Sequence, residues 1–189
     1  MACGTGNYAA FHVDEPFSEG NAGAHSTRDF CYYNVLRVWK DMDPSFPFLD
    51  SHGKGYDVRD GSDWEGTLEA RIRGRLRDAQ NLVLFLSSAT KHSRALREEV
   101  DYGVNGLGLP IIVVYPDCSE RSDIVLCESS RVRKEIEDLW GRLPGLRDSM
   151  ERVPTIHVPN KKQLIRHALQ TDDFKAGTKG KPGISFYPC

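Results

Sequence analysis

The sequence lacks the features that would point to a membrane or to nucleic acid. No apolar run approaches the ~20 residues needed to span a bilayer. The first residues also lack the basic and apolar segments of a secretory signal. The formal net charge is -2 over 189 residues, so there is no basic excess to attract nucleic acid or an anionic membrane surface. We therefore expect a cytoplasmic protein that binds neither nucleic acid nor membrane.

Motifs for a metal site, a disulfide framework or a resident cofactor are also missing. The five cysteines are odd in number and widely spaced, without a Cys-x-x-Cys pair, so neither a zinc site nor a disulfide framework is expected. No Gly-x-Gly-x-x-Gly follows the first predicted strand. Residues 51–57 contain glycines, but not at the spacing of a phosphate-binding loop. We expect no metal and no standing cofactor.

The chain is organised around a predicted β-α-β unit in residues 81–117. It opens with the apolar run 82–86 and closes with the apolar run 111–114, and an amphipathic segment of about three helical turns lies between them. Continuous apolar runs, in contrast to alternating ones, are typical of strands that helices cover on both faces. These runs therefore indicate neighbouring strands of a parallel sheet.

The helix of this unit contains a carboxylate at the border of its apolar stripe. Leu96, Val100 and Val104 recur at helical spacing and should face the sheet. At about 100° per residue, Glu98 points away from that stripe, whereas Glu99 lies at its edge. Both could be solvated helix charges, since glutamate is rarely buried without a partner. If one of them faces a crevice, the spacing favours Glu99.

The remaining pattern of alternating strands and helices predicts the fold class. We expect an α/β, flavodoxin-like or Rossmann-like open sheet, mainly parallel and five-stranded, with helices on both faces. Residues 1–170 would form the domain and residues 171–189 a C-terminal tail. The other predicted strands are residues 7–11, 46–49 and 153–159, and the other predicted helices are residues 27–40, 64–79, 130–140 and 161–169.

Polar residues follow the predicted strands, and in open parallel sheets ligands bind outside the carboxyl ends of the strands. This rule gives a candidate rim without any knowledge of strand order. The rim contains His12 and Asp14, then Asp50, Ser51 and His52, then Ser87, Ser88 and Thr90, then Tyr115 and Asp117, and finally Asn160.

The ordered combination of these segments resembles TIR and TIR-like domains, and is most similar to the ThsB family of bacterial Thoeris anti-phage defence. The resemblance covers residues 7–117 best, and the rest only in architecture. It implies a TIR-like fold. The segments that carry it are Phe11-His12, Leu49-Asp50-Ser51, the amphipathic run 64–79, the strand and serines at 82–88, and the stretches 93–100 and 108–114.

The resemblance implies a catalytic residue and a substrate. The family's catalytic glutamate falls on Glu99, which agrees with its place on the helix, although Ala95 stands where many TIR domains carry tryptophan. The positions that match the neighbourhood of the family's nucleotide pocket are Phe11, His12, Asp50, Ser51 and Ser87. The implied activity is that of an NAD glycohydrolase or ADP-ribosyl cyclase or transferase, with NAD as substrate.

The resemblance also implies partners, and other functions stay open beside it. The product would be an ADP-ribose-derived signal that reaches a separate effector protein, and the chain could self-assemble. One alternative is a TIR-like interaction module without catalysis. Another is a nucleoside-processing enzyme similar to deoxyribosyltransferases, which share an open α/β sheet and an active carboxylate. One fold hosts many chemistries, so the fold alone does not choose between them.

Overall fold

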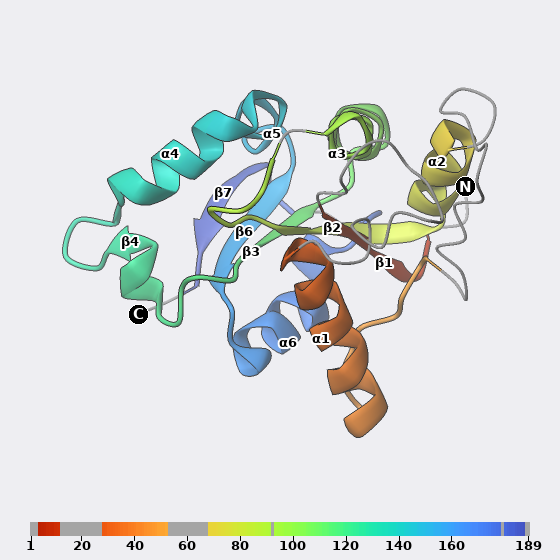
Figure 1. The fold of residues 1–189 in the computed structure, drawn as a ribbon, viewed down its shortest axis with the longest axis horizontal. Coiled ribbons are helices and arrows are strands. Elements are labelled where there is room, and N and C mark those ends of the chain that lie inside the picture. The colour runs from red at the N-terminus through yellow and green to blue at the C-terminus, as the bar shows by residue number, and fades with distance from the viewer. Residues whose placement is uncertain (1–3, 12–27, 53–67, 92, 179, 188–189) are drawn as a thin grey trace.

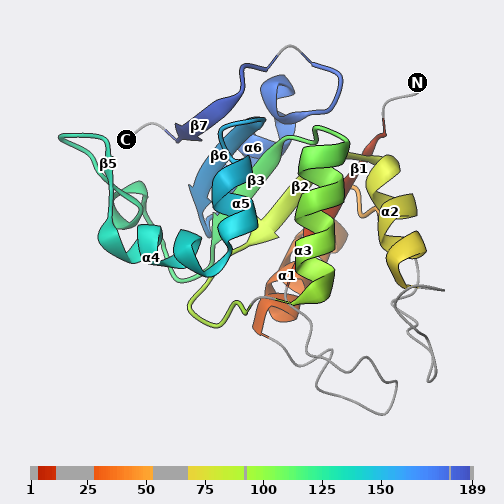
Figure 2. The ribbon, with the colours of Figure 1, turned by 90° about the horizontal axis from the view of Figure 1, so that it is seen from above.

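The protein has a five-stranded parallel sheet covered on both faces by helices (Figures 1 and 2). A computed structural model describes residues 4–11, 28–52, 68–91, 93–178 and 180–187. The strand order is β1-β2-β3-β6-β7, and each neighbouring pair runs parallel. The five strands of this sheet are β1 (Gly6–Ala10), β2 (Ala79–Phe85), β3 (Ile111–Tyr115), β6 (Pro154–Pro159) and β7 (Gly183–Phe186).

The helices form the two outer layers. The core residues assign α2 (Glu69–Arg77), α3 (Arg94–Val100), α4 (Lys134–Arg142) and α5 (Pro144–Ser149) to one face, and α1 (Arg28–Met42) and α6 (Lys162–Gln170) to the other. The α3 helix continues into a π-helical turn, η3 (Asp101–Gly106). A small antiparallel pair, β4 (Val125–Leu126) and β5 (Arg131–Val132), and the short 3-10 turns η4 (Arg121–Asp123) and η5 (Asp172–Phe174) complete the elements.

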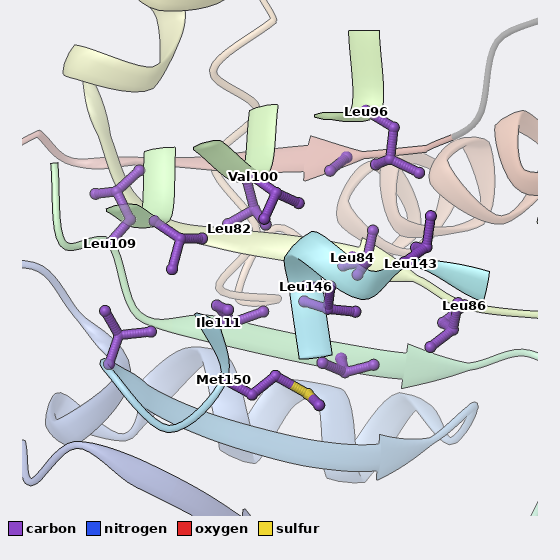
Figure 3. Packing of buried hydrophobic residues seen from close by; sticks show 14 of the residues in the cluster. Leu82, Leu84, Leu86, Leu96, Val100, Leu109, Ile111, Leu143, Leu146 and Met150 are labelled. Carbon is purple, nitrogen blue, oxygen red and sulfur yellow. The ribbon is translucent and has the colours of Figure 1, made fainter. Parts of the chain in front are cut away.

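The central strands are buried on both faces, as their continuous apolar runs predict. Leu82 and Leu84 of β2 point into the core under α3 and α5, whereas Val83 and Phe85 point into the core under α1 and α6. Figure 3 shows the first of these clusters, where leucines of β2 meet Leu96 and Val100 of α3 and Leu146 of α5. The predicted α/β fold, an open parallel five-stranded sheet of the flavodoxin-like kind with helices on both faces, is confirmed.

One predicted strand is wrong. Residues 46–49 form no strand, and only an isolated parallel bridge joins Asn7 to Asp50. The segment is held by the side chain of Asn7, whose amide oxygen accepts the backbone N–H of Leu49 at 2.7 Å. Pro47 cannot donate a backbone hydrogen bond, and this limits the ladder that the segment could form with β1.

The fifth strand of the sheet comes from a part of the chain that we expected to be a tail. Gly183–Phe186 pairs in parallel with β6, with Thr155 opposite Ile184 and His157 opposite Phe186. The division into residues 1–170 and 171–189 stays a prediction, although these four residues contribute to the main sheet. In the part of the chain that the structure describes, no helix is long and apolar enough to cross a membrane.

The cysteines differ in state. Cys31 and Cys118 are free, whereas Cys127 is disulfide-bonded, which the wide spacing of the cysteines did not predict.

Candidate functional site

The α3 helix places Glu99 against the edge strand β1. The helix is capped by Ser93, whose hydroxyl accepts the backbone N–H of Leu96 at 3.1 Å. Leu96 and Val100 are buried on the sheet, and Glu99, at the border of their stripe on the helical wheel, also turns inward and is only 5% exposed. Glu98 lies toward α2 instead, where it pairs with Arg73 at 2.6 Å. The two glutamates therefore differ as their helical positions predict.

One oxygen of the Glu99 carboxyl group accepts a hydrogen bond, and the other accepts none from the described residues. The hydroxyl of Tyr8 donates to Oε1 at 2.7 Å. The other oxygen, Oε2, is buried and has no hydrogen-bond partner among the described residues. Burial raises the pKa of Glu99 to about 8, against the opposing effects of the Tyr8 hydrogen bond and the positive charge of Arg75. At neutral pH this carboxyl group is therefore mostly protonated until a cation or a hydrogen-bond donor arrives.

His52 packs beside the Tyr8–Glu99 pair. Its ring lies 4.4 Å from the ring of Tyr8, between centroids, and its Nε2 is 2.8 Å from the carbonyl oxygen of Ala9. Burial lowers the pKa of His52 to about 4, so the ring is neutral at physiological pH. Because a carbonyl can only accept, the proton lies on Nε2. His52 thus ties the 50–52 turn to β1.

Asp50 holds the aromatic side chains of this edge in place. One of its carboxylate oxygens accepts the Tyr33 hydroxyl at 2.5 Å, and the other accepts the backbone N–H of His52 at 3.0 Å. Burial, followed by this hydrogen bond, raises the pKa of Tyr33. Tyr33 stacks on Phe11 with 5.3 Å between ring centroids. Asp50 therefore links the 50–52 turn to the helix α1.

The other predicted site residues have different places. The hydroxyl of Ser51 donates to the carbonyl oxygen of Asn7 at 3.0 Å, which anchors the same turn. Ser87 follows β2 and is fully buried. Its hydroxyl accepts the N–H of Ala89 at 3.1 Å, and its own N–H donates to the Thr90 hydroxyl at 2.9 Å. These bonds shape the turn after the strand. His12 lies outside the described residues.

The structure thus brings Glu99, Phe11, Asp50 and Ser51 to one edge of the sheet, around β1. Tyr8, Tyr33 and the central place of His52 were not predicted from the sequence. Strand alternation could have found Tyr8, since alternate residues of β1 face opposite sides and Tyr8 faces α3 with Ala10. Among the described residues, no group of three or more His, Cys, Asp or Glu side chains could hold a metal ion.

Tyr8→Phe should raise the pKa of Glu99 above about 8, because the Tyr8 hydrogen bond lowers it. A hydrogen bond to a charged group contributes ~1.5–3 kcal/mol, so we expect an increase of about 1 or more. Carbon-13 NMR of labelled glutamate carboxyl groups measures this directly, with Tyr32→Phe on α1 as the control. An unchanged Glu99 titration in Tyr8→Phe would show that the hydroxyl has no influence on the carboxyl group.

A comparison with known protein families agrees with this arrangement. The family described as "Thoeris protein ThsB, TIR-like domain" matches residues 8–121. The match begins at Tyr8 and contains Asp50, Ser51, Ser87 and Glu99, and it covers more than half of the 189 residues. The matched part includes the last three residues of β1 and the whole of β2 and β3. The chain belongs to the family of Thoeris ThsB TIR-like domains.

Proposed function

We propose that the chain cleaves NAD at the bond between nicotinamide and ribose and makes an ADP-ribose-derived signalling molecule in anti-phage defence. The observation that carries the proposal is the carboxyl group of Glu99. It is buried on the β1 edge, one oxygen accepts a hydrogen bond from Tyr8, and the other has no hydrogen-bond partner among the described residues. A carboxyl group with a raised pKa in such a place is typical of a functional site.

The reaction needs one well-placed carboxylate. When the bond between the nicotinamide nitrogen and the ribose carbon breaks, its electron pair leaves with nicotinamide, which departs neutral, and the ribose becomes an oxocarbenium-like cation. A carboxylate beside the ribose stabilises that charge and accepts strengthening hydrogen bonds from the sugar hydroxyls. A nucleophile then bonds to the ribose carbon and loses a proton, which completes hydrolysis, cyclisation or transfer. Glu99 has the free oxygen for this role.

The raised pKa of Glu99 couples ionisation to substrate binding. The carboxyl group is mostly neutral at pH 7 because burial disfavours its charge. The nicotinamide ring of NAD is positively charged, and a cation nearby favours the carboxylate. When NAD binds, the positive charge of its nicotinamide ring would therefore lower the pKa of Glu99 and convert it to the carboxylate. Without NAD, Glu99 stays neutral and the site holds no uncompensated buried charge.

The other residues of this edge would shape the pocket. Asp50, Ser51 and His52 fix the turn beside β1, and Phe11 and Ser87 follow the carboxyl ends of β1 and β2, where open parallel sheets bind ligands. We assign to Phe11, Asp50, Ser51 and Ser87 the support of the nucleotide, and to His12 a place near it. NAD would be a substrate and not a resident cofactor, and no metal is required.

The proposal places the chain in the cytoplasm with its substrate. Its product would diffuse to a separate effector protein, which would sense the signal. The chain itself needs only to make the molecule, so its described surface need not contact that effector.

The test is liquid chromatography with mass spectrometry on extracts from phage-infected cells that express the wild type, Glu99→Gln or Glu98→Gln. We expect NAD loss and a new ADP-ribose-derived species with the wild type and Glu98→Gln, and neither with Glu99→Gln. Glu98→Gln is the matched control because it removes a neighbouring carboxylate that pairs with Arg73 on the outer side of the same helix.

Other outcomes would select another function. If all three extracts are identical while the proteins are folded, the chain is an interaction module and the catalytic proposal fails. If the purified wild type acts on deoxynucleosides but not on NAD, and Glu99→Gln does not, the chain is a deoxyribosyltransferase-like enzyme. Glu98→Gln extracts that match Glu99→Gln would instead assign the loss to a general change in α3.

A further inference from the structure

Tyr8 and Glu99 form a hydrogen-bonded pair between β1 and α3. The hydroxyl of Tyr8 donates to Oε1 of Glu99 at 2.7 Å, and both side chains are buried. Oε2 of the same carboxyl group is also buried, and it accepts no hydrogen bond from the described residues. The two oxygens of Glu99 are therefore not equivalent, and Oε2 is the one whose hydrogen-bonding capacity is fully available.

The position of the Tyr8 hydroxyl is fixed by the strand and by an aromatic neighbour. Tyr8 lies within β1, opposite Leu82 of β2, and its ring is part of the core under α3. The ring of His52 packs against it with 4.4 Å between centroids. His52 is itself held on β1 by the bond from its Nε2 to the carbonyl oxygen of Ala9. The backbone and the ring of Tyr8 are both restrained, so its hydroxyl stays directed at Glu99.

Ionisation of Glu99 strengthens its bond with Tyr8. Hydrogen bonds to a charged acceptor are shorter and about twice as strong as bonds between neutral groups. A substrate that took both oxygens of the carboxylate would have to break this charged bond inside a buried site, which is costly. The bond from Tyr8 should therefore persist when NAD is bound and the carboxylate has formed.

The hydroxyl groups of the nicotinamide ribose differ in their value to the reaction. The two oxygens of an unrestrained carboxylate can accept two neighbouring donors side by side, and the ribose offers such a pair, the 2′-hydroxyl and the 3′-hydroxyl. This arrangement is unavailable here because Tyr8 holds Oε1. Only the 2′-hydroxyl lies beside the reacting carbon, where its hydrogen bonds strengthen in the oxocarbenium-like transition state.

We propose that Tyr8 is a positioning residue that holds Oε1 of Glu99 and thereby restricts the contact between Glu99 and the nicotinamide ribose to one bond, from the 2′-hydroxyl to Oε2. This role rests on the proposed cleavage of NAD and specifies which part of the sugar the carboxylate recognises. Tyr8 acts through Glu99 and not by contact with NAD.

Oε2 also carries the proton of the neutral carboxyl group. Oε1 already accepts the Tyr8 hydroxyl, so the proton of neutral Glu99 lies on Oε2. Oε2 must lose this proton to solvent before it can accept the 2′-hydroxyl. Proton release and sugar recognition therefore occur at the same atom, and the rate of NAD cleavage should follow the ionisation of Glu99.

Competition between NAD and its deoxy analogues tests which hydroxyl is recognised. Lysate of phage-infected cells that express the wild type receives NAD mixed with an equal amount of the analogue that lacks either the 2′-hydroxyl or the 3′-hydroxyl of the nicotinamide ribose. The relative rates of loss give the ratio of kcat/KM values, whatever the amount of active enzyme. Loss in Glu99→Gln lysate is subtracted, and each rate is corrected for the uncatalysed hydrolysis of that compound.

The wild type should discriminate strongly against one analogue only. Loss of the 2′-hydroxyl should lower kcat/KM by about 10-fold or more, because it removes a hydrogen bond to a charged group. Loss of the 3′-hydroxyl should lower kcat/KM by less than about 3-fold, because it removes no contact with Glu99.

Tyr8→Phe keeps the ring, removes the hydroxyl and releases Oε1. The difference between the two analogues should shrink by about 3-fold or more, since both oxygens can then meet the two hydroxyls. The rate of NAD loss well below KM should also rise at a higher pH than in the wild type, because the Tyr8 bond favours the carboxylate. Tyr102→Phe, which removes a hydroxyl that Arg77 binds on η3, should keep both wild-type readouts. A merely structural role of Tyr8 would lower activity and move neither.

The outcomes separate this role from the proposed function. Wild-type lysate that consumes NAD no faster than Glu99→Gln lysate would overturn both. A wild type that cleaves NAD but disfavours the two analogues equally would overturn the recognition of one hydroxyl and leave NAD cleavage standing. An unchanged preference in Tyr8→Phe would overturn the role of Tyr8. The wild-type competition needs no variant of Tyr8, so it decides the point even if Tyr8→Phe fails to fold.

Discussion

Replacing Glu99 by glutamine should stabilise the fold at neutral pH and, under the proposed function, abolish NAD cleavage. The pKa of Glu99 is about 8 in the folded protein, against its ordinary 4.5. Between these values the folded state holds a proton that the unfolded chain releases, so the stability contributed by this group falls as pH rises. At pH 7 the cost is about 3 kcal/mol, from ~1.36 kcal/mol per pKa unit. Glutamine is neutral at every pH and keeps an oxygen for the Tyr8 hydroxyl.

Urea unfolding at several pH values measures this effect. We expect Glu99→Gln to exceed the wild type in free energy of unfolding by a margin that grows between pH 4.5 and pH 8. The amide group of glutamine adds a buried donor, but the cost of that donor does not change with pH. The readout is therefore the growth of the margin and not its absolute size. Glu98→Gln, which loses only a partly exposed ion pair with Arg73, should show a constant and small difference.

A margin that stays constant from pH 4.5 to pH 8 would contradict the prediction, because it would mean that Glu99 titrates alike in the folded and unfolded states. A difference in free energy of unfolding that grows with pH would mean that Glu99 destabilises the folded protein. Such a residue is typical of a functional site, where stability and activity oppose each other. The result would support the site independently of any measured reaction.

The inward position of Glu99 could be predicted because it depends only on local geometry. The stripe of Leu96 and Val100 fixes which side of α3 faces the sheet, and the neighbouring glutamates then separate by 100° of rotation. The continuous apolar runs of β2 and β3 likewise need only burial on both faces. These features are decided within one element, so the sequence pattern contains them.

Features decided between distant segments were missed. Tyr8 meets Glu99 across 91 positions of sequence, and no local pattern pairs a strand tyrosine with a particular helix residue. The short run Gly183–Phe186 forms a strand by pairing with β6. Its own four residues give little indication of a strand. Residues 46–49 had strand composition, but the side chain of Asn7 takes the backbone N–H of Leu49 in place of a ladder.

The start of α4 shows a similar limit. Ser129 and Ser130 suggested a helix cap, but Arg131–Val132 pairs with Val125–Leu126 and delays the helix to Lys134. Ser130 has a φ of 54° in the turn of this hairpin, a conformation that nonglycine residues adopt mainly in turns. A serine can cap a helix or form a turn, and the pairing of the flanking residues decides between these two roles.

His157 should make the protein sensitive to acid. The residue lies on β6, is 1% exposed and is surrounded by the rings of Tyr115, Trp140 and Phe186. Burial lowers its pKa to about 3, against an ordinary 6.5. Between these values the unfolded chain takes up a proton that the folded state does not, so the contribution of His157 to stability falls as pH falls through this window. At pH 5 the loss relative to pH 7 is about 2 kcal/mol.

The hydrogen bonds around His157 explain why it resists protonation. The indole N–H of Trp140 donates to the Tyr115 hydroxyl at 2.6 Å, so that hydroxyl donates its own proton to His157 Nδ1 at 2.7 Å. The ring proton therefore lies on Nε2, which is buried and has no partner among the described residues. A protonated ring would break the bond from Tyr115 and add a charge that the surrounding rings do not neutralise.

His157→Phe tests this prediction, because phenylalanine keeps a ring in the core and removes the titration. We expect the variant to be less stable than the wild type at pH 7, since the Tyr115 hydroxyl loses its acceptor. Between pH 7 and pH 5, however, the free energy of unfolding of the variant should fall by about 2 kcal/mol less than that of the wild type. His167→Gln, at an exposed position of α6, should keep the wild-type dependence. Parallel curves for the wild type and His157→Phe would contradict a buried neutral histidine.

The two buried groups act in opposite directions, and this makes their effects separable. Glu99 destabilises the fold as pH rises above 4.5, and His157 destabilises it as pH falls below 6.5. In the wild type the two changes largely cancel between pH 5 and pH 6.5. Glu99→Gln should therefore uncover the full acid sensitivity of His157, and combining it with His157→Phe should remove the contributions of both groups. Additive behaviour is expected because the two groups lie on different helix–strand contacts, Glu99 against β1 and His157 between β3 and β7.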